Sequence, residues 1–257
     1  MKIRKKTAVS AAVTLLTAGL STLSVFTLKK IDCIKRGVRL MPSGFTITAH
    51  AGANNTKPNT SASLAAAFNS NADTVEFDLN FTSDGTPVLS HDAPKDGCFS
   101  LREAFAFAAK HTDKTINIDV KAVGNIEKIP PLADEYGITE NIFFTGIEMK
   151  DIAYVREKAP RIPYWLNFKP DRTRLNNEKY ILSIVENVKN AGAVGLNIKY
   201  CYASETMIRI FHENDLLVSL WTANTIPQLL RTMSLAPDNI TTKRPDLLKG
   251  LIYAFSQ

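Results

Sequence analysis

The sequence predicts a TIM barrel, the (β/α)8 fold in which each of eight parallel strands is followed by a helix. From residue 45 onward, eight short apolar runs typical of strands alternate with runs of helical periodicity. Residues 40–257, which contain these runs, have a length close to the roughly 250 residues typical of one such domain. The expected class is α/β, with a transmembrane or signal-anchor helix in front of the barrel.

The expected strands end in polar residues, and the carboxyl ends of the strands are where active sites form in this fold. An additional short strand is expected over residues 87–92, after a turn at 83–85, and it would bring His91 back over the mouth of the barrel. The eight barrel strands are expected at 45–50, 74–81, 115–120, 141–147, 162–168, 193–200, 216–221 and 239–242.

Helices are expected in the connections between these strands. Ser100 stands where it can cap the second helix. The third connection contains Pro130 and Pro131, so its helix is expected to be short or broken. The expected helices cover residues 61–69, 100–110, 126–136, 150–158, 178–191, 204–214, 226–234 and 246–254.

Residues 8–28 carry no charge over 21 positions, which is enough to span ~30 Å of hydrocarbon. A basic run precedes these residues. No small-residue cleavage site occurs before Lys29, so an uncleaved signal anchor is favoured over a removed signal peptide. The predicted domains are a basic N-terminus, 1–39, that contains this anchor, and a barrel, 40–257. We expect a single-pass protein of the cell membrane. Basic residues flank both ends of the span, so only the signal-like start favours an extracytoplasmic barrel.

The formal charge of +6 belongs to the N-terminus and not to the barrel. Nine of the 31 Lys and Arg residues and one of the 25 acidic residues lie in 1–39, which leaves 22 basic and 24 acidic residues in 40–257. Nucleic-acid binding requires a basic face on the folded part, so nucleic acid is excluded as a partner. The basic tail suits anionic lipid head groups. Three scattered cysteines, none in a CxxC pair, argue against a disulfide framework and a zinc site.

Two histidines bracket two carboxylates within one stretch of the chain: His50, then Glu76 and Asp78, then His91. Glu76 and Asp78 lie two apart near the end of one strand, so their side chains share a face. Two imidazoles can exchange protons with a substrate, and carboxylate oxygens can hold a hard cation. Together these groups indicate metal-assisted cleavage of a phosphodiester.

The motifs of the chain resemble, in order, those of the glycerophosphodiester phosphodiesterase family. The family patterns HRG, PENT and GAD.(I/V)E.DV..T.DG.PV..HD are matched by HAG (50–52), KPNT (57–60), NAD (71–73) and VEFDLNFTSDGTPVLSHD (75–92). INIDVK (116–121), SLWTAN (219–224) and ITTKRPDLL (240–248) resemble its motifs NIEIK, VWTVN and ITD.PD. The resemblance spans residues 45–250 and is most specific over 72–92.

The resemblance implies hydrolysis of glycerophosphodiesters, of lipid head-group or glycerol-phosphate type, to an alcohol and a phosphomonoester such as glycerol 3-phosphate. It also implies a cofactor, Ca²⁺ or Mg²⁺, and leaves open which histidine is the acid and which the base. The implied roles are His50 and His91 for acid–base catalysis, Glu76, Asp78 and Asp119 for the cation, Lys121 for phosphate charge, and Trp221 for the alcohol pocket.

The chain departs from the family pattern at three positions of the expected site. Ala51 replaces the arginine after the first histidine, Pro58 replaces the glutamate of PENT, and Asp119 replaces the usual glutamate. Losing a positioned arginine weakens stabilisation of transition-state charge unless another cation substitutes, and Lys57 in the same loop is one candidate. We therefore expect an active enzyme with altered substrate preference.

Two other functions remain open at this point. The first is a related phospholipase C-like or D-like activity, which would yield a cyclic phosphate or diacylglycerol. The second is a catalytically silent phosphoester-binding membrane protein, suggested by Ala51 and Pro58. The alcohol of the substrate and the oligomeric state do not follow from the sequence.

Overall fold

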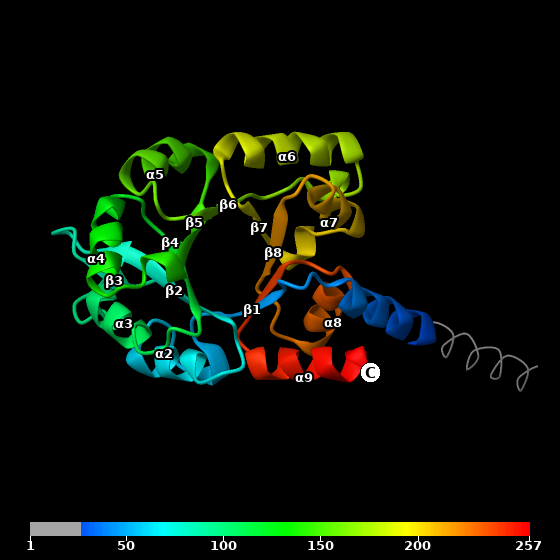
Figure 1. Cartoon of the computed structure of the whole chain (residues 1–257), viewed down its shortest axis with the longest axis horizontal. Helices are drawn as coiled ribbons and strands as arrows, with labels where there is room; N and C mark the ends of the chain where they lie inside the picture. Colours follow the sequence, from blue (N-terminus) through cyan, green and yellow to red (C-terminus); the bar gives the residue numbers. More distant parts are fainter. Residues whose placement is uncertain (1–26) are drawn as a thin grey trace, which may run out of the picture.

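The computed structural model describes residues 27–257, which contain a closed barrel of parallel strands surrounded by helices (Figure 1). The eight barrel strands pair in chain order, and β1 pairs with both β2 and β9, which closes the barrel. The predicted barrel is thereby confirmed. Its strands are β1 (Thr46–Ala49), β2 (Thr74–Phe81), β4 (Thr115–Val120), β5 (Ile142–Ile147), β6 (Tyr164–Asn167), β7 (Gly195–Lys199), β8 (Leu217–Trp221) and β9 (Asn239–Thr242).

The additional short strand is also present, as β3 (Pro87–Leu89). It runs antiparallel to β2 on the outside of the barrel, with Leu79 opposite Leu89. The backbone N–H of Ser90 donates to the carbonyl of Asp78 at 3.0 Å. His91 therefore follows directly from a segment that is held against the carboxyl end of β2.

A helix lies in each expected connection. In the third, Pro130 and Pro131 stand in the first turn, where backbone N–H groups need no intrahelical partner, and a 3-10 turn precedes the helix. Ser100 caps α3 and forms a capping box with Glu103. The helices are α2 (Ser61–Phe68), α3 (Leu101–Ala108), α4 (Ile129–Glu135), α5 (Ile152–Lys158), α6 (Glu178–Ala191), α7 (Glu205–His212), α8 (Ile226–Ser234) and α9 (Pro245–Ser256). Short 3-10 turns are η1 (Ala53–Asn55), η2 (Ile126–Lys128), η3 (Thr139–Asn141), η4 (Met149–Asp151), η5 (Arg172–Arg174) and η6 (Tyr200–Tyr202).

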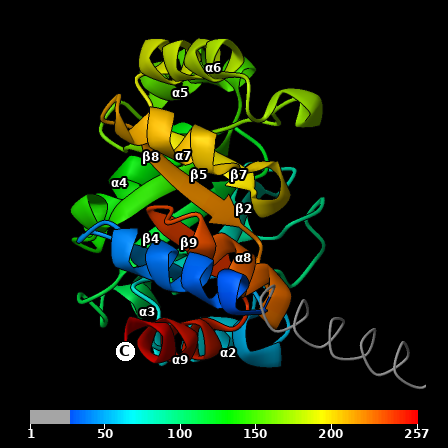
Figure 2. The ribbon, with the colours of Figure 1, turned by 90° about the vertical axis from the view of Figure 1, so that its right-hand side faces the viewer.

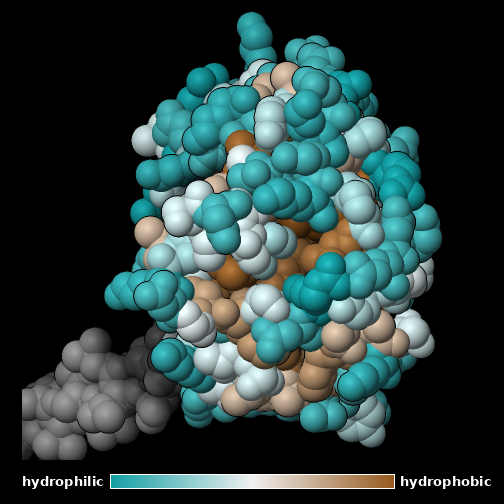
Figure 3. All heavy atoms as spheres, turned by 90° about the vertical axis from the view of Figure 1, so that its left-hand side faces the viewer, coloured by the Kyte–Doolittle hydropathy of each residue, from teal (hydrophilic) through white to brown (hydrophobic). Residues whose placement is uncertain are grey.

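The apolar core lies between the strands and the surrounding helices. Phe77 and Phe144 on the strands and Phe105 and Phe211 on the helices are fully buried there. On the face that carries α3, α4 and α5, hydrophilic side chains cover the outside and hydrophobic ones show mainly in a central hollow (Figure 3). This core fixes the strands whose ends carry the polar residues discussed below.

A helix over residues 27–40 packs on the barrel beside α8 (Figure 2). Its Ile34 and Val38 belong to the buried core. Gly37 approaches α8 so closely that a Cβ there would lie 2.3 Å from the carbonyl oxygen of Met233. The predicted division at residue 40 therefore falls at the end of a packed helix. The predicted span, 8–28, lies outside the described residues except for its last two. Between residues 27 and 257, every helix is too short or too polar to cross a membrane.

Candidate active site

Side chains from the carboxyl ends of β1, β2, β4 and β8 and from the loop after β3 surround one cavity of about 550 Å³. Six of the seven predicted site residues line it, and Asp78, the seventh, lies beside two of them. The six predicted residues that line the cavity are His50, Glu76, His91, Asp119, Lys121 and Trp221. The fold thus brings together residues that are up to 171 positions apart in the sequence.

Three carboxylates form the acidic centre of this cavity. Glu76, Asp78 and Asp119 each offer an oxygen atom, and these atoms lie within 4.8 Å of one another. Glu76 Oε1 is buried and accepts no hydrogen bond from the described part of the chain, whereas the buried Asp78 Oδ1 has the ammonium of Lys121 3.0 Å away as its ion-pair partner. Buried oxygens without a donor are rare because leaving them unpaired is costly. Hard carboxylate oxygens in this arrangement fit a divalent cation such as Ca²⁺ or Mg²⁺.

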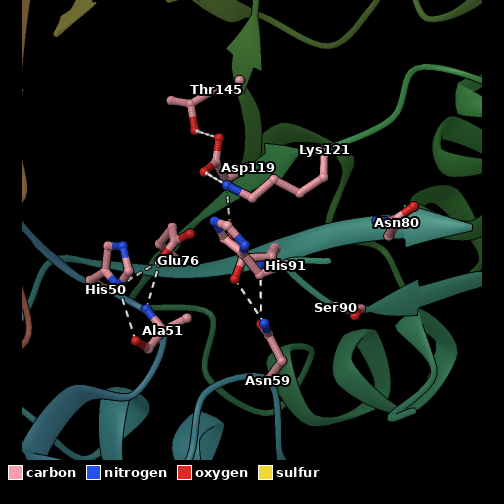
Figure 4. A network of polar contacts seen from close by, with 12 residues as sticks. His50, Ala51, Asn59, Glu76, Asn80, Ser90, His91, Asp119, Lys121 and Thr145 are labelled. Carbon is pink, nitrogen blue, oxygen red and sulfur yellow. Dashed lines mark hydrogen bonds and ion pairs between the residues drawn. The ribbon is translucent and has the colours of Figure 1, made fainter. Parts of the chain in front are cut away.

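One carboxylate oxygen of Glu76 accepts a hydrogen bond, and the other accepts none from the described residues. Its Oε2 accepts a hydrogen bond of 2.6 Å from the backbone N–H of Ala51, while Oε1 points to the other carboxylates (Figure 4). Burial raises the pKa of Glu76 well above its usual range, and the negative charges of Asp78 and Asp119 raise it further. The backbone N–H of residue 51 therefore positions the Glu76 carboxylate, and this contact does not depend on the side chain at position 51.

Asp78 is held by the side-chain amide of Asn59. Asn59 Nδ2 donates to Asp78 Oδ2 at 2.7 Å, and Asn59 Oδ1 accepts from the backbone N–H of Asp78 at 3.1 Å (Figure 4). Asn59 has a positive φ of 58°, a conformation that asparagine adopts more readily than most residues. The loop between β1 and α2 thus fixes one oxygen of Asp78, while the other faces the ammonium of Lys121.

We expect Asn59→Ala to weaken binding of Ca²⁺ by about 10- to 100-fold, the usual effect of losing a residue that orients a ligand. Isothermal titration with Ca²⁺ measures this effect. Asn54→Ala is a matched control, because Asn54 has the same left-handed backbone but contacts Asp246 on the outside of the barrel. Equal Ca²⁺ affinity of the two variants would contradict the assigned role of Asn59.

Asp119 is positioned by the neighbouring strand β5. Thr145 Oγ1 donates to Asp119 Oδ1 at 3.0 Å. The next residue, Gly146, has φ of 78°, and a Cβ there would lie 2.3 Å from the carbonyl oxygen of Val120 and 2.7 Å from Asp119 Oδ1. A glycine at this position therefore lets β5 approach closely enough to support the shorter aspartate.

The ammonium of Lys121 contacts two of the three carboxylates, those of Asp119 and Asp78. Its Nζ is 2.5 Å from Asp119 Oδ2 and 3.0 Å from Asp78 Oδ1 (Figure 4). Burial lowers the pKa of Lys121, but the negative charges of Asp119 and Asp78 outweigh it, so that the pKa is raised above its usual value. The ammonium is therefore positively charged and contacts two of the expected cation ligands.

His50 extends from the end of β1 with its imidazole 26% exposed. Its Nδ1 lies 2.9 Å from the carbonyl oxygen of Ala51, which can only accept, so Nδ1 carries a proton and Nε2 has a free lone pair in the neutral ring. Burial lowers the pKa of His50, although the Ala51 carbonyl and the charge of Asp78 oppose the shift. The ring is thereby favoured in its neutral, proton-accepting form.

His91 has a more open setting, with its side chain 66% exposed. Its Nδ1 is 2.9 Å from Asp92 Oδ1. It lines both the central cavity and an adjoining groove, which includes Lys57 and Pro58. Trp221 closes β8 at the cavity, and its Nε1 is buried with no hydrogen bond to the described residues.

The structure adds polar residues that the sequence analysis did not single out. Beneath the carboxylates, Thr145 also donates to Asn117 at 2.8 Å, and Asn197 donates to Asn167 at 2.9 Å. All four line the cavity. The available signal was the strand period, because Asn117 lies two positions before Asp119 and so shares its face.

Comparisons with known proteins agree with this fold and these motifs. Residues 50–118 match the model of the glycerophosphoryl diester phosphodiesterase family. A Bacillus subtilis protein provisionally named a glycerophosphodiester phosphodiesterase is 25% identical over 240 residues, which cover 79% of this chain and 96% of that protein.

Two solved structures are similar in fold. The Thermotoga maritima glycerophosphodiester phosphodiesterase has a TM-score of 0.62 and 21% identity, over 80% of this chain and 98% of its own. An Oleispira antarctica phosphodiesterase in complex with the product sn-glycerol-3-phosphate has a TM-score of 0.64 and 17% identity, over 84% and 99%. The predicted resemblance is confirmed by these findings.

Proposed function

We propose that this chain, which belongs to the glycerophosphodiester phosphodiesterase family, uses a divalent cation and two histidines to hydrolyse glycerophosphodiesters to a phosphomonoester and an alcohol. The observation that carries the proposal is the set of three carboxylates in a cavity that both histidines line, in which a buried oxygen of Glu76 has no donor and a buried oxygen of Asp78 faces the Lys121 ammonium. The similar Oleispira antarctica structure, which holds sn-glycerol-3-phosphate, supports glycerol 3-phosphate as the product.

Glu76, Asp78 and Asp119 would hold the cation through the carboxylate oxygens that lie within 4.8 Å of one another. When bound there, a divalent cation supplies positive charge to a phosphate oxygen and makes phosphorus more electrophilic. The chain itself orients the three carboxylates. The N–H of Ala51 holds Glu76, the side chain of Asn59 holds Asp78, and the hydroxyl of Thr145 holds Asp119.

We infer that His50 is the base and His91 the acid. The Nε2 of neutral His50 accepts a proton from the nucleophile. The nucleophile is water, or a neighbouring hydroxyl of the glycerol, in which case the cyclic phosphate formed is then opened by water to the phosphomonoester. His91, in the open part of the cavity, donates a proton to the oxygen of the departing alcohol. In-line attack places nucleophile and leaving group on opposite sides of phosphorus, so two separate imidazoles are required.

Product identification by ³¹P NMR tests the proposed reaction. The full-length chain is incubated with glycerophosphocholine, glycerophosphoethanolamine and a glycerol-phosphate oligomer, with Ca²⁺, with Mg²⁺ or with chelator. A phosphomonoester signal that requires the cation supports the proposal. Accumulation of a cyclic phosphate instead would favour the phospholipase-like alternative, and cation binding without turnover would favour the silent one.

Cation affinity is expected to increase with pH. Because the folded protein raises the pKa of Glu76, this carboxyl holds a proton at pH values where an ordinary glutamate is ionised, and the cation must displace that proton. The dissociation constant should then fall by up to about tenfold per pH unit below the pKa of Glu76 and level off above it. Titration calorimetry across pH 5.5 to 8, in two buffers of different ionisation enthalpy, would show release of protons on cation binding that decreases as the pH rises. A pH-independent affinity over this range would contradict the protonated Glu76.

We further propose that the chain is a single-pass membrane protein through residues 8–28, with the barrel outside the cytoplasm. The supporting observation in the folded part is the orientation of the 27–40 helix, in which Cys33 and Arg36 contact Glu205 at the start of α7, near the carboxyl end of β7. The start of this helix therefore lies toward the end of the barrel that carries the cavity. Recovery of the full-length chain in the soluble fraction after carbonate extraction would contradict anchoring.

A further inference from the structure

Lys243 lies beside His50 at the mouth of the barrel. Strands β1 and β9 pair in parallel with Ala49 opposite Thr242, and the N–H of His50 donates to the carbonyl of Thr242 at 2.9 Å. The next pair along this register is His50 and Lys243. The backbone of Lys243 is fixed on both sides, because its carbonyl accepts from Asn54 N–H and its N–H donates to Asn224 Oδ1.

Lys243 follows β9 directly and is half-buried, next to the residues that line the cavity but not among them. Asn239 is buried inside the barrel, where it accepts from Thr48, and Thr241 lines the cavity. Lys243 is the first residue after this inward row, and Arg244, which follows it, is exposed. His50 and Lys243 each follow directly from the carboxyl end of their strand, and the two strands are paired up to these residues. Lys243 and His50 thus stand at the same rim of the barrel.

The ammonium of Lys243 is a free positive charge in this part of the site. Between residues 27 and 257 no side chain forms a hydrogen bond or ion pair with it. Lys121, by contrast, is engaged by Asp78 and Asp119. Burial lowers the pKa of His50, and the charge of Lys243 adds to that lowering, which agrees with their proximity.

The other candidate cation, Lys57, lies in a different place. It is exposed and lines the groove that continues from the open side of His91, together with Asp92 and Lys95. Of the two lysines, Lys243 is therefore the one whose backbone follows directly from the strand end paired with His50.

We propose that Lys243 binds a nonbridging oxygen of the substrate phosphate and so replaces the arginine that Ala51 lacks. This rests on the proposed function and adds a residue to its site. When Pro245 and Asp246 are matched to the ITD.PD motif, Lys243 takes the position of the motif's first aspartate. Relative to the motif patterns, the chain therefore has no cation at position 51 and a cation in place of an acid at position 243.

The test compares full-length wild type with Lys243→Met, Lys243→Arg and Lys57→Met. Binding of sn-glycerol 3-phosphate is measured by calorimetry in saturating Ca²⁺, and kcat and KM are measured with glycerophosphocholine. A charge-assisted hydrogen bond to phosphate is strong, so Lys243→Met should weaken binding and lower kcat/KM by about tenfold or more. Lys243→Arg should recover most of both, and Lys57→Met should stay within about twofold of wild type.

Ca²⁺ affinity serves as the check that the site is intact, because Lys243 contacts none of the three carboxylates and its variants should bind Ca²⁺ as wild type does. Wild-type binding of sn-glycerol 3-phosphate by Lys243→Met, failure of arginine to restore binding, or no binding by the wild type would each overturn the proposal. Binding that depends on Lys243, without turnover, would contradict the proposed hydrolase activity but would agree with the proposed contact between Lys243 and phosphate.

Discussion

Glu76→Gln is expected to abolish tight cation binding and to lower kcat/KM for a glycerophosphodiester by about a thousandfold or more. The substitution removes the charge of a fully buried ligand whose second oxygen has no other partner. A bound cation contributes several kcal/mol of transition-state stabilisation, and each ~1.4 kcal/mol corresponds to a tenfold change in rate. Calorimetry with Ca²⁺ and steady-state kinetics measure both effects.

The same variant should be no less stable than wild type in the presence of chelator. Glutamine retains an oxygen to accept from Ala51 N–H and removes a buried carboxyl close to Asp78 and Asp119. The melting temperature in chelator separates loss of function from unfolding. Glu186→Gln, on the exposed side of α6, is the matched control. Unchanged Ca²⁺ affinity of Glu76→Gln would show that the carboxylate cluster is not the cation site.

His50→Ala and His91→Ala should each lower kcat by about 10²- to 10⁴-fold, the usual range for losing a positioned acid or base. The two variants should differ in their pH profiles. His50 must be neutral to accept a proton, and its pKa is lowered, so the acid limb of the wild-type profile should lie below the ordinary value of 6.5 and disappear in His50→Ala. His91 must be protonated to donate, so the alkaline limb should disappear in His91→Ala.

A substrate with a 4-nitrophenol leaving group separates the two roles. This alcohol departs without protonation, so it should restore much of the activity of His91→Ala and little of that of His50→Ala. His111→Ala is a control, since His111 stacks on Phe68 and Phe107 outside the cavity and affects stability alone. Rescue of His50→Ala instead would reverse the assignment of acid and base.

Local patterns were sufficient to predict the barrel, because each strand–helix unit is specified by nearby residues. Apolar runs such as 115–120 and a capping residue such as Ser100 determine their elements with little tertiary information. The 27–40 helix was assigned partly to a basic tail because its lysines and arginines dominate the composition. Ile34 and Val38, four positions apart, are the apolar face that packs it on the barrel.

The site was predictable where function depends on strand position and unpredictable where it depends on loop conformation. Glu76, Asp78 and Asp119 follow from strand ends and period two. The contact between Asn59 and Asp78 requires a left-handed residue in a loop 19 positions away, which no local pattern indicates. The position of Lys243 likewise depends on strand pairing, since the pairing of β1 with β9 brings it close to His50, 193 positions away in the sequence.

The most direct test of cation-assisted hydrolysis is the rate at which the full-length chain releases sn-glycerol 3-phosphate from glycerophosphocholine as Ca²⁺ or Mg²⁺ is added back after chelation. The site predicts negligible release in chelator, recovery that saturates with the affinity measured by calorimetry, and no recovery in Glu76→Gln. Equal release in chelator and in cation, or recovery in Glu76→Gln, would contradict a reaction that depends on a cation bound by these carboxylates.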